Sequence, residues 1–229
     1  MAKFTPSPLF SDIRNKIGGV VATKVRSGNM VRRKVSPIQP RSSAQRGVRS
    51  SFSYLSKLWS GSSMASNRAA WNSLAATIQK TDAIGNKFKL TGHQMFVQFN
   101  RNLRAIGLTE VLTVPASLAV LDTGAITLAK AGGPPITVLS VALTNAVTSA
   151  ETAIIQATAP QSPGIASGGQ RYRQIASEDS AGTWPYDFLA EYVAKFGTPT
   201  TGKVVYVRVK AVTEATGASS GWQSSSITI

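Results

Sequence analysis

Residues 20–35 carry the first regular pattern in the chain, an alternation of apolar and polar positions in their first half. The β-branched residues of its first half are interleaved with Lys24 and Arg26, and a period of two is typical of a strand. Ser27-Gly28-Asn29 supplies turn residues before apolar positions resume at Met30. The pattern predicts a β-hairpin, which is marginally stable as a two-stranded ribbon. Its cations repel one another unless an anionic surface meets them, so docking should stabilise it.

The segments on either side of the hairpin lack this period. Residues 1–19 contain two prolines and a Gly-Gly pair, so we predict an extended basic arm without regular structure of its own, ordered only by a partner. Residues 36–41 also contain two prolines, and proline lacks the N–H group that a central strand requires. We therefore predict an extended connector there.

A helical period follows the connector. One apolar stripe is formed by residues spaced four, three and four apart: Val48, Phe52, Leu55 and Trp59. It predicts a helix that is capped by Ser42 or Ser43 and ends near Gly61. The same reasoning predicts a second helix from about Met64 to Ile78 and a third that runs from its cap at Thr91 to Gly107, with a turn and a short strand between them. Three helices with two tryptophans can form a small core.

After Gly107 the composition changes to Val, Thr, Ala, Ser, Gly and Pro. Strand-like runs recur about every 10–15 residues with Gly or Pro clusters between them, at residues 111–121, 124–130, 136–143, 151–159, 170–176, 186–194, 203–212 and 225–229. This spacing is typical of a β-sandwich. The predicted fold class is an α+β N-terminal module, with a basic β-hairpin plus about three helices at residues 20–110, followed by an all-β immunoglobulin-like sandwich at residues 111–229.

Charge is segregated between these two parts. The formal net charge is +15, and residues 1–110 hold 18 of the 25 Lys and Arg but only three of the 10 acidic residues, a net of +15. Residues 111–229 hold the remaining seven of each sign, a net of zero. A solvated surface that merely keeps the protein soluble does not explain this partition. It is expected when one domain faces nucleic acid, an anionic membrane or an acidic protein surface and the other does not.

The residue types that most active sites require are sparse. The chain has no cysteine and one histidine, His93, which excludes a multi-histidine metal site and which we expect at the surface, at the start of the third helix. Glu178 and Asp179 are adjacent carboxylates in a predicted loop, without a fixed basic or hydroxyl partner. The glycines of residues 162–170 lack a phosphate-loop pattern and predict an inter-strand loop. We therefore predict a protein without catalytic, metal or cofactor-binding residues, that is, not an enzyme.

No membrane segment is expected. The first residues carry prolines and charges where a secretory signal has an apolar stretch. The longest strongly apolar run, from Ile136 to Leu143, is far shorter than the roughly 20 residues of a membrane span. The sequence predicts a soluble protein that is not exported.

The basic residues of the N-terminal half form the candidate site. Contacts with an anionic partner are predicted for Lys24, Arg26, Arg32, Arg33, Lys34, Arg41, Arg46 and Arg49. Contacts of this kind with phosphate carry no sequence discrimination and depend strongly on salt, and an acidic protein surface satisfies the same residues. The aromatic residues of the predicted helices lie on apolar stripes, so core packing is expected of them rather than base stacking. They are Trp59, Trp71, Phe96 and Phe99.

Four segments carry a resemblance to a known family: GGVVATKVRSGNMVRRKV, SSAQRGVRSSFSYLSKLW, NRAAWNSLA and GNKFKLTGHQMFVQFNRNL. The chain resembles a group of uncharacterised bacteriophage and prophage proteins, often of Bacteroidetes-type hosts. In them a basic hairpin and helices with Q-x-x-V-R, R-x-A-W-N and T-G-x-x-x-F-x-x-x-N motifs precede an immunoglobulin-like or fibronectin-like domain. The motif positions here are Gln45, Val48, Arg49, Arg68, Ala70, Trp71, Asn72, Thr91, Gly92, Phe96 and Asn100. The runs beginning IIQATAPQSP and FGTPTTGKV are also similar, so the resemblance covers nearly the whole chain.

The resemblance implies a virion structural protein without a cofactor or an active site, and it leaves open whether the position is head, neck or tail. Together with the charge, it predicts a minor or auxiliary capsid-associated component, assembled in the host bacterial cytoplasm, whose basic half docks on the capsid lattice or on packaged DNA. The expected partners are other virion proteins, in many copies on a symmetric lattice, and packaged nucleic acid, with no membrane. The alternatives are a DNA-binding protein in its own right and a tail or neck adhesion module.

Overall fold

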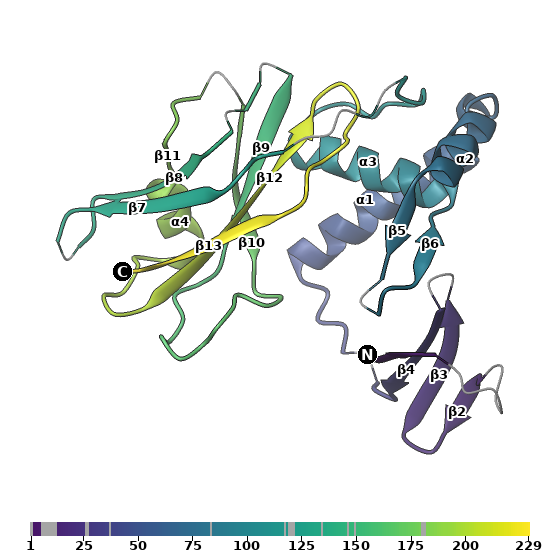
Figure 1. Ribbon diagram of the computed structural model, residues 1–229, viewed down its shortest axis with the longest axis horizontal. Helices are drawn as coiled ribbons and strands as arrows, with labels where there is room; N and C mark the ends of the chain where they lie inside the picture. Colours follow the sequence, from purple (N-terminus) through teal and green to yellow (C-terminus); the bar gives the residue numbers. More distant parts are fainter. Residues whose placement is uncertain are drawn as a thin grey trace. The chain divides into compact units, whose positions relative to one another are not determined.

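The computed structural model describes residues 2–5, 13–25, 28–36, 38–82, 84–116, 118, 122–133, 135–145, 147–148, 150–179 and 182–229. Within these residues the structure is mixed α+β, with four α-helices and several antiparallel sheets (Figure 1). The chain divides into two compact units. Unit 1 comprises Met1–Gln98 with Leu112–Val114, and unit 2 comprises Phe99–Val111 with Pro115–Ile229.

Unit 1 begins with a four-stranded antiparallel sheet of strand order β1-β4-β3-β2 (Figure 1). The strands are β1 (Ala2–Phe4), β2 (Asn15–Ile17), β3 (Val20–Val25) and β4 (Gly28–Arg33). The predicted hairpin is confirmed as β3 and β4. Its register pairs Val25 with Gly28, so Gly28 and Asn29 lie in the strand rather than in the turn, and Ser27 lies outside the described residues.

The prediction that residues 1–19 form an arm without regular structure is wrong where the structure describes them. β1 pairs with β4, and β2 pairs with β3. The physical reason is that a two-stranded ribbon leaves a row of backbone N–H and C=O groups unpaired along each edge. Two short strands satisfy those groups. Each has only three residues, too few to show a period in the sequence.

The helices of unit 1 follow the predicted order. They are α1 (Ser43–Ser60), the 3₁₀ helix η1 (Ser62–Met64), α2 (Arg68–Thr77) and α3 (Gly92–Ala105). Ser42 is the N-cap of α1, because its side chain accepts a hydrogen bond from the Gln45 amide at 3.3 Å. The second helix begins at Arg68 rather than near Met64, because η1 and a turn at residues 65–67 precede it. Between α2 and α3 the chain forms a hairpin of β5 (Gln79–Thr81) and β6 (Lys87–Lys89).

The motif residues of the helical segment join the helices to one another. The Arg68 guanidinium donates hydrogen bonds of 2.8 Å to the carbonyls of Trp59, Ser60 and Gly61. These carbonyls lie at the end of α1, where a helix leaves its last acceptors unpaired and its dipole favours a cation. Arg68 therefore stabilises the end of α1 from the first turn of α2.

A capping box starts α3. The Gln94 amide donates to the Thr91 hydroxyl at 3.2 Å, and the Thr91 amide donates to the Gln94 side chain at 2.9 Å. The next residue, Gly92, donates its amide to the Asn72 side chain at 3.1 Å. A Cβ atom at Gly92 would lie 2.7 Å from the Asn72 backbone nitrogen, so glycine is required for this close approach of α2 and α3.

The core of unit 1 is centred on Trp71, which is fully buried. Its ring meets the buried Phe96 ring edge-on, with centroids 5.6 Å apart. Its indole N–H donates to the Leu112 carbonyl at 2.8 Å. The predicted core positions Trp71, Phe96 and Phe99 are confirmed as buried, whereas Trp59 is partly buried.

Two antiparallel sheets build unit 2. One has the order β11-β8-β7, from β11 (Tyr186–Asp187), β8 (Val138–Leu143) and β7 (Ile126–Ala131). The other has the order β10-β9-β12-β13, from β10 (Arg173–Asp179), β9 (Glu151–Ala157), β12 (Val204–Thr213) and β13 (Gln223–Thr228). One hydrophobic core holds side chains from both sheets, including Leu139 and Val141 of β8 and Val205 and Val207 of β12.

Two of the predicted strand runs in this half are wrong. Among the described residues of 111–121 no strand forms. In the run 186–194 the strand β11 has two residues and is followed by the helix α4 (Leu189–Phe196). Phe188, Tyr192 and Phe196 are spaced by four residues, which is a helical period, and Phe188 and Tyr192 are fully buried in the core of unit 2.

The second half of α3 belongs to unit 2 and is held there by Asn102. The Asn102 side-chain amide donates to the Gly217 carbonyl at 2.9 Å, and its oxygen accepts from the Lys210 ammonium at 2.6 Å. Lys210 also lies 5.1 Å from the centroid of the Trp222 ring. Lys210 is thus a partly buried cation of β12 with one polar partner and one aromatic partner.

This burial makes the stability of the protein depend on pH. Burial lowers the pKa of Lys210 to about 8, and the nearby cations Arg101 and Arg208 add to the shift. An unfolded lysine has a pKa of about 10.4, so between about pH 8 and 10 the unfolded chain binds more protons at this position and the free energy of unfolding rises with pH. We expect the wild type to gain about 1–2 kcal/mol over this range relative to Lys210→Met, in urea denaturation. A difference that does not change with pH would contradict it.

Candidate anion-binding surface

Seven of the eight predicted contact residues are described, and all seven are exposed. Lys24 lies on β3, Arg32 and Arg33 lie on β4, Lys34 follows β4, Arg41 directly precedes the N-cap of α1, and Arg46 and Arg49 lie on α1. Arg26 lies outside the described residues. The predicted cations therefore lie on the N-terminal sheet, on α1 and on the segment that joins them.

The strand register distributes the sheet cations over both faces. Residues directly opposite each other share a face, and successive residues alternate. Arg33 lies opposite Val20, whereas Arg32 lies opposite Val21, so the two arginines point to opposite faces. Lys24 shares the face of Arg33. It is four residues from Val20 on β3, so the two point the same way, and Val20 lies opposite Arg33. The sheet is thus basic on both sides, and one flat anionic surface cannot meet all of its cations.

Lys16 was not among the predicted contacts, and the register places it with them. It lies opposite Val21 from β2, while Arg32 lies opposite the same residue from β4. Lys16 and Arg32 therefore share one face, with β3 between them, and both are exposed. The other face combines Arg33 with the exposed apolar side chains Ile17 and Val20, which share one row across the sheet. In the sequence, only the charge of Lys16 could have indicated that it belongs to this surface.

One acidic residue of unit 1 is engaged by a different lysine. The Asp82 carboxylate lies 3.0 Å from the Lys3 ammonium, and its side chain is almost completely covered. Burial alone raises the pKa of Asp82, but hydrogen bonds from Lys3 and from the amides of Asn86 and Ile84 outweigh that effect, so the pKa is lowered. Lys3 also lies 5.6 Å from the centroid of the Phe88 ring. The negative charge of Asp82 is therefore used by Lys3 and does not neutralise the exposed predicted cations of the sheet.

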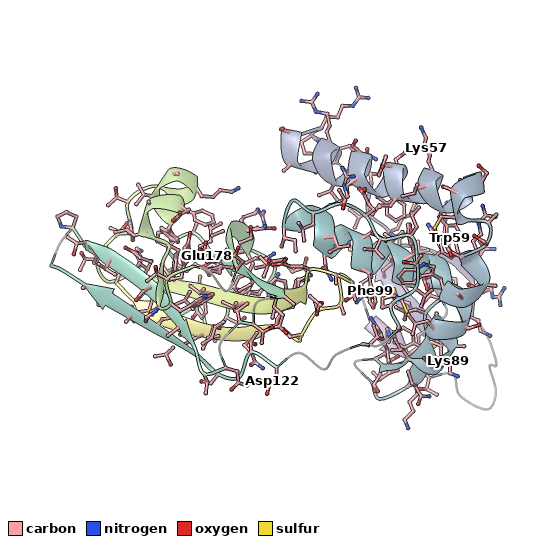
Figure 2. All side chains as sticks on the ribbon, turned by 90° about the horizontal axis from the view of Figure 1, so that it is seen from above. Lys57, Trp59, Lys89, Phe99, Asp122 and Glu178 are labelled. Carbon is pink, nitrogen blue, oxygen red and sulfur yellow. The ribbon has the colours of Figure 1, made fainter. Side chains whose placement is uncertain are left out.

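The first turns of α1 add a second basic region. α1 contains Arg46, Arg49 and Lys57 and no acidic residue. Arg46 and Arg49 lie near its N-terminus, where the helix dipole is positive and favours an anion. Lys57 is exposed in the last turn of the same helix and is labelled in Figure 2. This helix therefore presents positive charge along its exposed sides.

His93 is not the surface residue that the sequence predicted. It lies in the first turn of α3 and is half-buried, with its ring 5.5 Å from the Trp59 ring and 6.5 Å from the Phe52 ring, centroid to centroid. Its Nε2 atom is buried and has no hydrogen-bond partner among the described residues. Packing against these two aromatic residues of α1 removes part of the His93 ring from solvent. His93 thus packs between helices of unit 1.

Glu178 and Asp179 end strand β10 rather than lying in a loop, so that prediction is wrong. The extended backbone results from pairing with β9, in which Glu178 lies opposite Ala153. The glycine-rich residues 162–170 do form a connection between strands, as predicted. In the part of the chain that the structure describes, no group of His, Asp and Glu residues is arranged to hold a metal ion, and no helix is long and apolar enough to span a membrane.

No protein-family model matches the chain. The curated proteins and the solved structures also give no match. The charge of unit 1 and the geometry of its exposed cations therefore carry the functional inference. Such an arrangement provides electrostatic attraction to an extended anionic surface.

Proposed function

We propose that this chain is a structural component of a bacteriophage particle, a minor or auxiliary capsid-associated protein that docks through the basic residues of unit 1. The observation that carries the proposal is the set of exposed cations on the N-terminal sheet and on α1, in a half of the chain that holds the whole net charge of +15. The motif resemblance to phage proteins supports the virion assignment. The protein acts in the particle, after assembly in the host cytoplasm.

Docking in this proposal is electrostatic and multivalent. An exposed ion pair contributes about 0–1 kcal/mol, so a single copy holds weakly. Many copies on a symmetric lattice bind far more firmly, because linked sites raise the effective concentration of one another. Basic side chains on both faces of the sheet suit an anionic groove or a layer between two acidic surfaces. The partner is an acidic surface of other virion proteins or packaged DNA, and no reaction or cofactor is assigned.

We further propose that unit 2 is an immunoglobulin-like sandwich that faces a neighbour or solvent. In a constant-type immunoglobulin domain the first, second, fourth and fifth strands form one sheet, and the third, sixth and seventh form the other. The strands of unit 2, numbered β7 to β13 in chain order, group as first, second and fifth against third, fourth, sixth and seventh. Only the fourth strand, β10, is exchanged between the sheets, so the strand order supports this assignment.

Binding of the full chain to two polyanions tests the docking surface. The probes are a random-sequence DNA duplex and poly-glutamate, each across a salt series. We expect binding to at least one probe, and in Arg32→Gln/Arg33→Gln a fall of about one in the slope of log affinity against log salt for DNA. The two arginines point to opposite faces of the sheet, so one duplex contacts one of them, and each lost phosphate contact releases one counterion fewer. The matched control Lys130→Gln/Lys195→Gln removes two exposed cations of unit 2 and should leave the slope unchanged.

Each outcome of this experiment has a defined meaning. Binding to DNA identifies packaged nucleic acid as the anionic partner, whereas binding to poly-glutamate alone identifies an acidic protein surface. Binding to neither probe at low salt, or equal losses in both double variants, would refute docking through the N-terminal sheet. The virion assignment is checked separately by quantitative mass spectrometry of purified particles of a phage that encodes the chain, where its absence from the particle would refute it.

A further inference from the structure

The N-terminal half of α1 exposes an apolar stripe. The predicted stripe is continuous in sequence, but only its C-terminal half is covered: Leu55 is fully buried, whereas Val48 is 52% and Phe52 is 56% exposed. Residues three and four apart on a helix are neighbours on its surface, so Arg49 lies beside Phe52. Basic and apolar side chains thus share the uncovered part of α1.

This uncovered part of α1 is unusual for a helix of a folded unit. Most helical stability in proteins comes from packing of the apolar face, and isolated segments shorter than about 12–15 residues are marginal in water. DNA is a poor cover for this face, because a phosphate backbone offers no apolar surface to Val48 and Phe52. A second α1 is also a poor cover, because each α1 carries three cations and no carboxylate. The face fits a protein surface that is acidic and partly apolar.

Unit 2 has a surface pocket of that chemistry. The pocket has a volume of about 270 Å³, and its lining residues include the acidic Glu178, Asp179 and Glu214 and the apolar Ile106 and Leu108. It thus holds three of the 10 acidic residues of the chain, and no lysine or arginine lines it. A volume below about 300 Å³ is small for an organic ligand and suits one or two protein side chains.

The strand register places two of these acidic residues, Asp179 and Glu214, on the same side of the sheet. Asp179 ends β10 opposite Thr152 of β9, and Thr152 lies opposite Val212 near the end of β12, which Glu214 follows. Glu214 accepts a hydrogen bond from the Thr152 hydroxyl at 2.8 Å. Glu178, one residue before Asp179 on β10, points to the opposite face of the sheet. A guanidinium beside Asp179 and Glu214 would form charge-assisted hydrogen bonds with both carboxylates.

We propose that the exposed half of α1 in one copy of this chain docks into the acidic pocket on unit 2 of a second copy. Phe52 packs against Ile106 and Leu108, of which Leu108 is 40% exposed, and Arg49 binds the carboxylates. Arg46 is three residues before Arg49, so it lies beside Arg49 on the surface of α1 and also meets the acidic residues of the pocket. The two surfaces are different patches of the same chain, so the contact is head-to-tail and continues into a ring or a filament. This inference does not depend on the virion assignment.

The test is the molar mass of the full chain in solution. Analytical ultracentrifugation over a wide concentration range is expected to give a mass that rises beyond that of two chains and falls again at high salt, because the contact relies on charge. Two variants each remove one side: Arg46→Gln/Arg49→Gln/Phe52→Ser on α1, and Asp179→Asn/Glu214→Gln in the pocket. Each alone should associate at least about tenfold more weakly than the wild type.

Mixing the two variants is the decisive measurement. One intact α1 face and one intact pocket remain in the mixture, so an equimolar mixture should form a pair of chains and no larger species. The control Lys130→Gln/Lys195→Gln should associate like the wild type, and circular dichroism should show that all variants are folded. A wild type that stays monomeric at every concentration, variants that associate like the wild type, or a mixture that stays monomeric would each overturn the proposal.

Discussion

Replacing Trp71 with alanine is expected to lower the free energy of unfolding of unit 1 by about 3–5 kcal/mol, the range for large aromatic residues removed from a core. The indole is fully buried, packs edge-on against Phe96 and donates a hydrogen bond to the Leu112 carbonyl. Alanine leaves a cavity and a carbonyl without its donor. Urea denaturation followed by circular dichroism measures the loss.

Trp71→Phe is the matched variant for this prediction. Phenylalanine keeps an aromatic ring against Phe96 but cannot donate to Leu112, so we expect a smaller loss of about 1–3 kcal/mol, from one unsatisfied carbonyl and a smaller void. A loss below about 1 kcal/mol for Trp71→Ala would show that Trp71 does not hold the helices of unit 1 together.

Replacing Gly217 with alanine is expected to destabilise unit 2 by about 2–5 kcal/mol. Gly217 has a φ of 74°, in the left-handed region that costs other residues about 1–2 kcal/mol. An added Cβ would also overlap the carbonyl oxygen of Phe99 and lie 3.0 Å from Cγ of Leu103, and overpacking of this kind costs a further 1–3 kcal/mol or so. Thermal and urea unfolding of the full chain measure the effect.

Gly202→Ala separates the two contributions. Gly202 has a φ of 76°, but a Cβ atom built there meets no other atom within 4 Å. Its substitution therefore carries the backbone strain without the overlap, and we expect a loss of about 1–2 kcal/mol. Equal losses in the two variants would show that the loop around Gly217 moves away from α3 without cost.

The elements with strong local signals could be predicted from the sequence. α1 has a serine N-cap and a four-residue stripe, α3 has a capping box, and β3 and β4 flank a sequence of turn residues, with alternation in the first strand. These signals depend on neighbours along the chain. β1 and β2 depend instead on the unpaired edges of the hairpin, which belong to residues distant in sequence, and three residues cannot show a period.

α4 was missed for a different reason. Its segment is rich in aromatic residues, which favour strands. The strand-like interpretation gave too little weight to the four-residue spacing of Phe188, Tyr192 and Phe196. Burial of Phe188 and Tyr192 in the core of unit 2 selects the helix. Tertiary packing thus outweighed propensity.

The candidate site was predicted in its composition but not in its arrangement. The sequence placed cations on a hairpin and on a helix, and those that the structure describes are exposed. The opposite directions of Arg32 and Arg33, and the addition of Lys16 to the face of Arg32, follow from the register of β2, β3 and β4. The exposure of Val48 and Phe52 also follows from tertiary structure, because the stripe itself predicted burial for all of its positions.

The three-residue length of β1 and β2 has a consequence for aggregation of the protein. These two strands form the edges of the N-terminal sheet, and the exposed edge of a sheet is a template on which further chains can pair. Short edge strands that carry lysine, here Lys3 on β1 and Lys16 on β2, resist this pairing. Newly synthesised copies can therefore accumulate in a crowded cell without stacking edge to edge into insoluble cross-β aggregates.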